Sequence, residues 1–137
     1  MKFSEVAKRV IELATTIREY WEAELPKYHP KYPLVQPGAG DPPSPPQEGE
    51  LRQFLLSRPA DEVYKLLALM YLGRGDFNAL GIVEMAKELR KSFSTDGAIR
   101  QMIAKGPLAD YLRDGLDELT TSGLDIDNLE TALATGS

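Results

Sequence analysis

The chain has 137 residues, of which 42% are hydrophobic and 27% charged, and its formal net charge is -5. It contains no cysteine and a single histidine, His29, which excludes disulfides, thiolate chemistry and a metal site built from several histidines of one chain. This size and composition are typical of one soluble globular domain, so we expect residues 1–137 to form a single domain, whose helical class follows from the patterns below.

Residues 1–25 are predicted to form one long amphipathic helix. Apolar residues recur every three or four positions from Phe3 to Leu25, and charged residues occupy most of the other positions. We expect Ser4 to cap the start of this helix. We expect Pro26 to end it, because the residue before a proline is pushed out of the helical region.

Residues 26–49 hold eight of the ten prolines, a density that excludes a helix or a central strand. We expect residues 26–37 to form an arm that lies against the helices through its rings, and residues 38–49 to form a looser polyproline-like spacer. The ring-bearing residues of this arm that are candidates for ligand contact are Tyr28, His29 and Tyr32.

Residues 50–134 are predicted to form the helical core. Nine of the ten residues from Val63 to Leu72 are apolar, so this helix should be central and covered on several sides. The same apolar segment also predicts a homodimer. No strand pattern of period two is present, and the fold class is an all-α compact bundle of about five to six helices, with the long N-terminal helix and a Pro-rich extended arm. Short helices are expected over residues 50–57, 59–72, 77–91, 99–103 and 107–122, with a weak last one through Ile126, Leu129 and Leu133.

The tripeptide Arg74-Gly75-Asp76 is explained by a tight turn between two helices. We expect Gly73 to end the first helix in the left-handed conformation and Asp76 to cap the second. Exposed residues on rigid corners are favoured binding positions, so Arg74 and Asp76 are candidate partner contacts. Gly115 lies within an apolar seam and predicts the close approach of another helix backbone.

Acidic residues line one side of the helix predicted after Pro107. Asp110, Asp114, Asp117 and Glu118 share that side, and we favour a solvated face over a divalent cation site. A calcium loop over residues 125–130 lacks the required glycine and an oxygen ligand, so no metal site is predicted. Lys105 is a weak candidate for holding an anion at the start of the same helix.

Charge distribution and hydropathy restrict the partners. Residues 105–137 carry two basic and seven acidic side chains, which disfavours nucleic-acid binding. The longest apolar run, Leu66 to Leu72, has seven residues, far below the roughly 20 of a membrane-spanning helix. The N-terminus does not resemble a secretory signal, so we expect a cytoplasmic protein without membrane contact.

Two strings stand out, LALMYLGRGD over residues 67–76 and PLADYLRDGL over residues 107–116. Together they resemble the two hallmark stretches of a small bacterial family, domain of unknown function 3775, over roughly residues 51–119. The resemblance implies a compact helical domain of bacterial origin, and it implies no activity, cofactor or catalytic residue.

The residues therefore favour a non-enzymatic protein–protein interaction module with an unidentified protein partner, and we assign no catalytic residue and no cofactor. The alternative is an enzyme or a protein that binds a small ligand or nucleotide. Its pocket would lie between the Pro-rich arm and the helices. The residues expected at that pocket are Tyr28, His29, Tyr32 and Arg74.

Overall fold

The structure, a computed structural model, describes residues 2–29, 40 and 43–129. These residues form six α-helices and two short 3-10 helices, and there is no strand among them. The predicted all-α class and the long N-terminal helix are confirmed. In chain order the elements are α1 (Phe3–Tyr28), α2 (Pro46–Leu56), α3 (Ala60–Gly73), η1 (Ala79–Gly81), α4 (Ile82–Ser92), α5 (Thr95–Ile103), α6 (Leu108–Thr121) and η2 (Ile126–Asn128).

The helix α3 is the centre of the bundle, as its composition predicts. It packs against α4, α5 and α6, and eight of its side chains are buried. Burial on several sides explains why almost every position of this helix is apolar. Because these side chains are buried within the chain itself, the segment no longer supports the homodimer that was expected from it. The buried residues are Val63, Tyr64, Leu66, Leu67, Ala68, Leu69, Met70 and Leu72.

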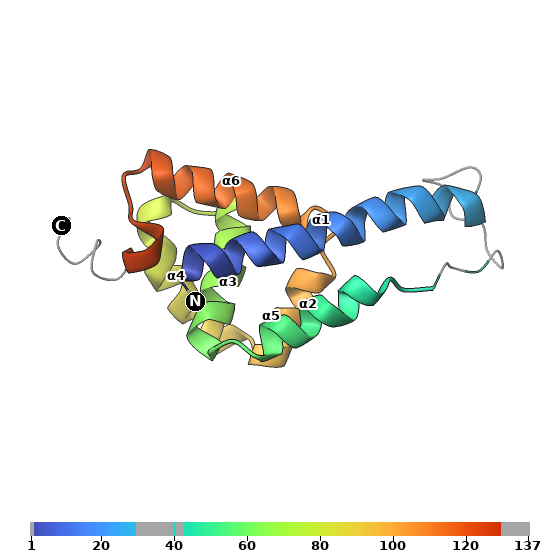
Figure 1. Cartoon of the computed structure of the whole chain (residues 1–137). Helices are drawn as coiled ribbons and strands as arrows, with labels where there is room; N and C mark the ends of the chain where they lie inside the picture. The colour runs from blue at the N-terminus through green and yellow to red at the C-terminus, as the bar shows by residue number, and fades with distance from the viewer. Residues whose placement is uncertain (1, 30–39, 41–42, 130–137) are drawn as a thin grey trace.

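The helix α1 runs across the bundle, with α6 along one side and α2 along the other (Figure 1). Its first half is apolar where it faces them, and the buried positions from Phe3 to Ala14 follow the three- and four-residue spacing. From Thr15 to Tyr28 no side chain of the helix is fully buried. The second half of α1 extends beyond the bundle in the same view.

The predicted end of α1 at Pro26 is wrong, because the helix continues through this proline to Tyr28. Proline has no N–H and therefore loses one bond to the carbonyl four residues earlier. Within the last turn only that one bond is affected, and the N–H of His29 still donates to the Leu25 carbonyl at 2.8 Å.

The start of α1 is capped by a different residue from the one expected. Lys2 occupies the N-cap position and its side chain caps nothing. Instead, the Asp127 carboxylate accepts hydrogen bonds from the Ser4 N–H at 2.9 Å and from the Ser4 hydroxyl at 3.0 Å. The last turn of the described chain thus supplies the cap of the first helix.

The Pro-rich segment falls partly outside the described residues, which include neither Tyr32 nor most of residues 30–42. The spacer is shorter than predicted, since α2 begins at Pro46 and not at residue 50. A proline fits the first position of a helix because its missing N–H has no partner there. The Tyr20 hydroxyl donates to the Pro43 carbonyl, and Pro45 is buried, so the residues just before α2 are held against α1.

The remaining helix ends largely follow their sequence signals. Ser94 caps α5 by accepting from the Gly97 N–H at 3.0 Å, and α6 follows directly after Pro107. Gly123, with φ of 76°, adopts the left-handed conformation just after the end of α6. The weak last helix is reduced to η2, and Leu133 lies outside the described residues. None of the helices among the described residues combines the length and apolar composition needed to cross a bilayer.

Candidate functional site

The two hallmark strings meet at the crossing of α3 and α6. A Cβ atom on Gly73 would overlap the backbone carbonyl of Tyr111. A Cβ atom on Gly115 would overlap the Leu69 carbonyl and lie 2.9 Å from its Cδ1 atom. The two helices therefore touch backbone to backbone at both glycines, which confirms the close approach predicted at Gly115.

The turn after α3 is a glycine-terminated helix end shifted by two residues from the prediction. Gly73 is the last helical residue, and Gly75 adopts the left-handed conformation, with φ of 86°. The N–H of Gly75 donates to the Leu72 carbonyl at 2.9 Å, and the N–H of Asp76 donates to the Tyr71 carbonyl at 3.1 Å. This pair of bonds is the Schellman motif. Gly73 was misassigned because its close contact with α6 cannot be read from its neighbours in sequence.

Asp76 does not cap the next helix. Its carboxylate lies 3.4 Å from the Arg74 Nε atom. The capping role passes to Asn78, whose side chain accepts from the Leu80 N–H at 3.4 Å. The predicted helix over residues 77–91 is accordingly divided into η1 and α4.

Arg74 lies over two tyrosine rings, one from each hallmark string. Its guanidinium carbon is 5.2 Å from the centre of the Tyr71 ring and 6.0 Å from the centre of the Tyr111 ring. Cation–π contacts of this kind stabilise a guanidinium over an aromatic face. The Arg74 side chain is still 34% exposed, so its orientation is restrained while it remains open to a partner.

A hollow of about 430 Å³ lies between the turn after α3 and α6. Three exposed carboxylates, Asp114, Asp117 and Glu118, line it, and none of them makes an ion pair within the part of the chain that the structure describes. Leu80, on the neighbouring η1, is 63% exposed. We call Tyr71, Arg74, Leu80, Tyr111 and this hollow the corner surface.

The four carboxylates predicted to share one side of α6, Asp110, Asp114, Asp117 and Glu118, have different surroundings. Asp110 accepts from Arg18 and Arg113, whereas the other three carboxylates face the hollow or solvent. Within residues 2–29, 40 and 43–129, no group of three or more acidic or histidine side chains is placed to hold a metal ion. Asp125, from the rejected calcium loop, instead accepts from the Asp127 N–H and the Asn128 amide, each at 3.0 Å.

The candidate residues of the arm lie away from the corner surface. Tyr28 is 39% exposed and His29 is 1% exposed, and both are at the end of α1. This end is distant from the end of α3, where Arg74 follows (Figure 1). Tyr32 lies outside the described residues. The structure therefore does not bring Arg74 together with Tyr28 and His29.

A second concave feature, which we call the α1 groove, lies between the second half of α1, the start of α2 and the corner from α5 to α6. Its volume is about 550 Å³. Lys105 lines it, as do two residues that the sequence analysis did not single out, Arg18 and Trp21. The spacing of Ile17, Trp21 and Leu25 on one face of α1 was the available signal. The apolar lining consists of Ala14, Ile17, Trp21, Leu25, Leu51, Ile103, Ala104, Pro107 and Leu108, and the charged lining of Arg18, Glu22, Glu48 and Lys105.

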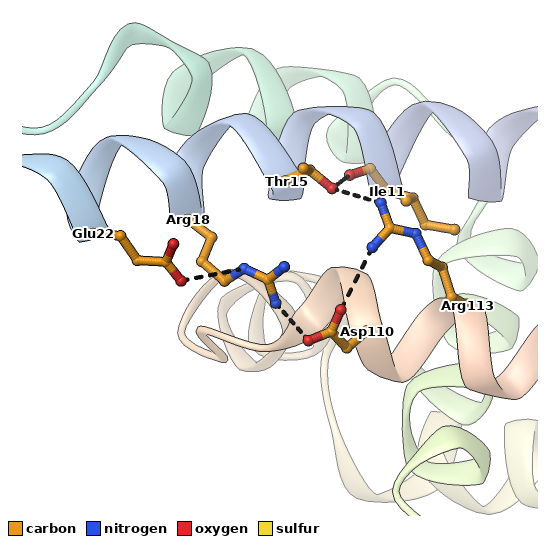
Figure 2. A network of polar contacts seen from close by, with 6 residues as sticks. All are labelled: Ile11, Thr15, Arg18, Glu22, Asp110 and Arg113. Atoms are coloured by element: carbon orange, nitrogen blue, oxygen red, sulfur yellow. Dashed lines mark hydrogen bonds and ion pairs between the residues drawn. The ribbon is translucent and has the colours of Figure 1, made fainter.

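A polar network joins α1 to α6 beside this groove (Figure 2). Asp110 on α6 binds Arg18 of α1 at 2.5 Å, and this hydrogen bond raises the pKa of Arg18. Arg113 reaches the Thr15 hydroxyl at 3.1 Å, and that hydroxyl donates to the Ile11 carbonyl at 2.7 Å. The network thus links α1 to α6 through partly exposed polar side chains.

The protein is all-α, and its two hallmark strings, over residues 67–76 and 107–116, lie together where α3 crosses α6. The family model for "Protein of unknown function (DUF3775)" matches residues 48–121, and the chain belongs to this family. The match runs from the first turn of α2 to the end of α6 and does not include α1. Searches of curated proteins and of solved structures each found no significant match.

Proposed function

We propose that this protein is a non-enzymatic protein–protein interaction module that binds its partner through the corner surface. The observation that carries this proposal is the position of Arg74, which is partly exposed and lies over tyrosines from both hallmark strings. Arginine and tyrosine are enriched in protein interfaces, and anchors of this kind contribute much of the binding energy.

The backbone crossing beneath this surface supports the proposal. Because α3 and α6 touch at Gly73 and Gly115, the residues that they carry have little freedom to shift relative to one another. A rigid scaffold lowers the entropy lost when a partner binds. The hallmark strings thus supply both the scaffold and three contact residues, Tyr71, Arg74 and Tyr111.

The chemistry of the corner surface indicates the kind of partner. Leu80 presents an exposed apolar side chain, and the adjoining hollow presents Asp114, Asp117 and Glu118. A complementary protein surface would place an apolar contact against Leu80 and basic side chains over the hollow.

The alternative, an enzyme that uses His29 and Arg74 together, has less support. The single histidine, His29, is buried at the end of α1, whereas Arg74 lies at the far end of α3. General acid–base catalysis requires its groups within hydrogen-bond reach of one substrate. These two residues do not meet that requirement together.

The test is quantitative affinity capture from native lysate with the wild type, Arg74→Ala and Arg100→Ala. Arg100 is a matched control, since it is exposed and pairs with Asp96 at 3.3 Å, much as Arg74 pairs with Asp76. We expect the partner to be retained by Arg100→Ala and lost from Arg74→Ala, while circular dichroism shows that both variants fold. Equal recovery of every captured protein by the two variants would remove the corner surface as the binding site.

A further inference from the structure

The α1 groove has the characteristics of a surface that another protein covers. The second half of α1 extends beyond the bundle (Figure 1), and Ile17, Trp21 and Leu25 lie on this half. These three side chains are partly buried and line the groove together with apolar residues of α2 and α6. An apolar groove of this form is typical of a site for a helix.

The charges of the groove are balanced. Two cations, Arg18 and Lys105, line it together with two carboxylates, Glu22 and Glu48. An interface with two-fold symmetry must be complementary to itself, because the same patch is contributed by both subunits. A patch with equal numbers of both charges around an apolar floor meets this condition.

We propose that the α1 groove is the interface between two copies of this chain, with the second halves of their α1 helices packed antiparallel across a two-fold axis. Trp21 and Leu25 of each copy then cover the open side of the other copy's groove. In this arrangement, Lys105 of one groove faces Glu48 of its symmetry mate, while Arg18 and Glu22 keep their ion pair within each copy. This surface is separate from the corner surface, so either proposal can fail without the other.

The distribution of charge over the whole molecule favours a second copy as the occupant. Asp114, Asp117 and Glu118, which make no ion pair among the described residues, lie from the middle of α6 toward its end, and the groove lies at its start. Figure 1 shows these two ends of α6 on opposite sides of the crossing with α3. Association through the groove keeps the acidic ends of the two copies apart, which limits their mutual repulsion.

The test uses the full chain and its only tryptophan, Trp21, which lines the groove. We expect sedimentation equilibrium to show a mass that rises from 15.2 kDa toward twice that value as concentration increases. The Trp21 emission should shift to shorter wavelength over the same range, because the second copy removes water from its ring. A mass that stays monomeric up to about 1 mM, or a dimer that forms without any change in Trp21 emission, would overturn the proposal.

Two matched variants place the interface. Leu25→Glu puts a carboxylate into the groove, whereas Leu56→Glu puts one at a 48% exposed position outside its lining. We expect Leu25→Glu to remain monomeric and Leu56→Glu to associate like the wild type, with both retaining the wild-type helix content. Association of Leu25→Glu at wild-type strength would overturn the proposal.

A charge reversal tests the electrostatic part of the proposal. Lys105→Glu leaves one cation against three carboxylates in the groove, and we expect it to weaken association about tenfold. Adding Glu48→Lys restores the balance and should recover most of the loss. Wild-type association of the single variant would show that charge matching does not hold the two copies together.

Discussion

The helix α6 contacts its two neighbours in different ways. Against α3 it packs through Gly73 and Gly115, where no side chain separates the two backbones. Against α1 it also uses long polar side chains, and Arg18, Asp110 and Arg113 are each roughly a third to a half exposed. The first contact lies inside the family match and the second includes a helix outside it. Close backbone packing tolerates almost no substitution, whereas bridging side chains can adapt.

Gly73→Ala is expected to cause the largest loss of stability. Its methyl group would overlap the Tyr111 carbonyl, and a backbone group cannot turn away as a side chain can. Overpacking of this kind costs about 3 kcal/mol in the free energy of unfolding. Urea denaturation measures this as a lower midpoint with an unchanged slope.

The control for Gly73→Ala is Gly49→Ala, in α2. A Cβ atom at residue 49 meets nothing within 4 Å, and alanine is the better helix former. This variant should gain up to about 1 kcal/mol. Equal effects of the two substitutions would contradict the backbone contact between α3 and α6.

Asp127→Ala is expected to have a smaller effect on α1. The variant leaves the Ser4 N–H and hydroxyl without their acceptor. Loss of an N-cap costs about 1 kcal/mol in the free energy of unfolding. Hydrogen exchange should show faster exchange in the first turn of α1 and unchanged protection in α3. An unchanged first turn would mean that Asp127 is not the cap.

Asp110→Asn tests the bridging side chains and should cost about 0.5 kcal/mol, because partly exposed ion pairs contribute little. The difference from the wild type should shrink as salt is added, since salt screens exposed charges. A loss of stability as large as that of Gly73→Ala would contradict this account, because it would show that the contact of α6 with α1 tolerates substitution no better than its contact with α3.

The smallest effect is expected from the pH dependence of Asp125. Hydrogen bonds from the Asn128 side chain and the Asp127 N–H lower the pKa of Asp125. A carboxylate with a lowered pKa in the folded state stabilises the fold at pH values above the ordinary pKa of aspartate. This stability is lost as the pH falls through the folded-state pKa of Asp125. The thermal midpoint of the wild type should exceed that of Asp125→Asn at neutral pH, and the difference should vanish in acid. A difference that is constant with pH would contradict the lowered pKa.

The sequence predicted the helices well where the signal is local. The apolar run of α3 and the seam of α6 with Gly115 both follow from residues within a turn or two of one another. Pro26 was misjudged because a proline in the last turn disrupts only one bond. The single-domain organisation, the cytoplasmic location and the protein partner stay predictions.

The candidate site was less predictable, because its contacts join distant segments. Ser4 and Asp127 are 123 positions apart, and no local pattern links them. The stacking of Arg74 on Tyr111 depends in the same way on how α3 crosses α6. The sequence selected Arg74 as an exposed corner residue, but the tyrosines that orient it and the groove around Trp21 required the fold.

The crossing of α3 and α6 is tested most directly by nuclear Overhauser effects between their backbones. We predict cross-peaks between the Hα protons of Gly73 and backbone protons of Tyr111, and between Gly115 and Leu69. Spectra in which Gly73 and Gly115 show cross-peaks only to residues of their own helices would contradict the crossing, and with it the fixed position of Arg74.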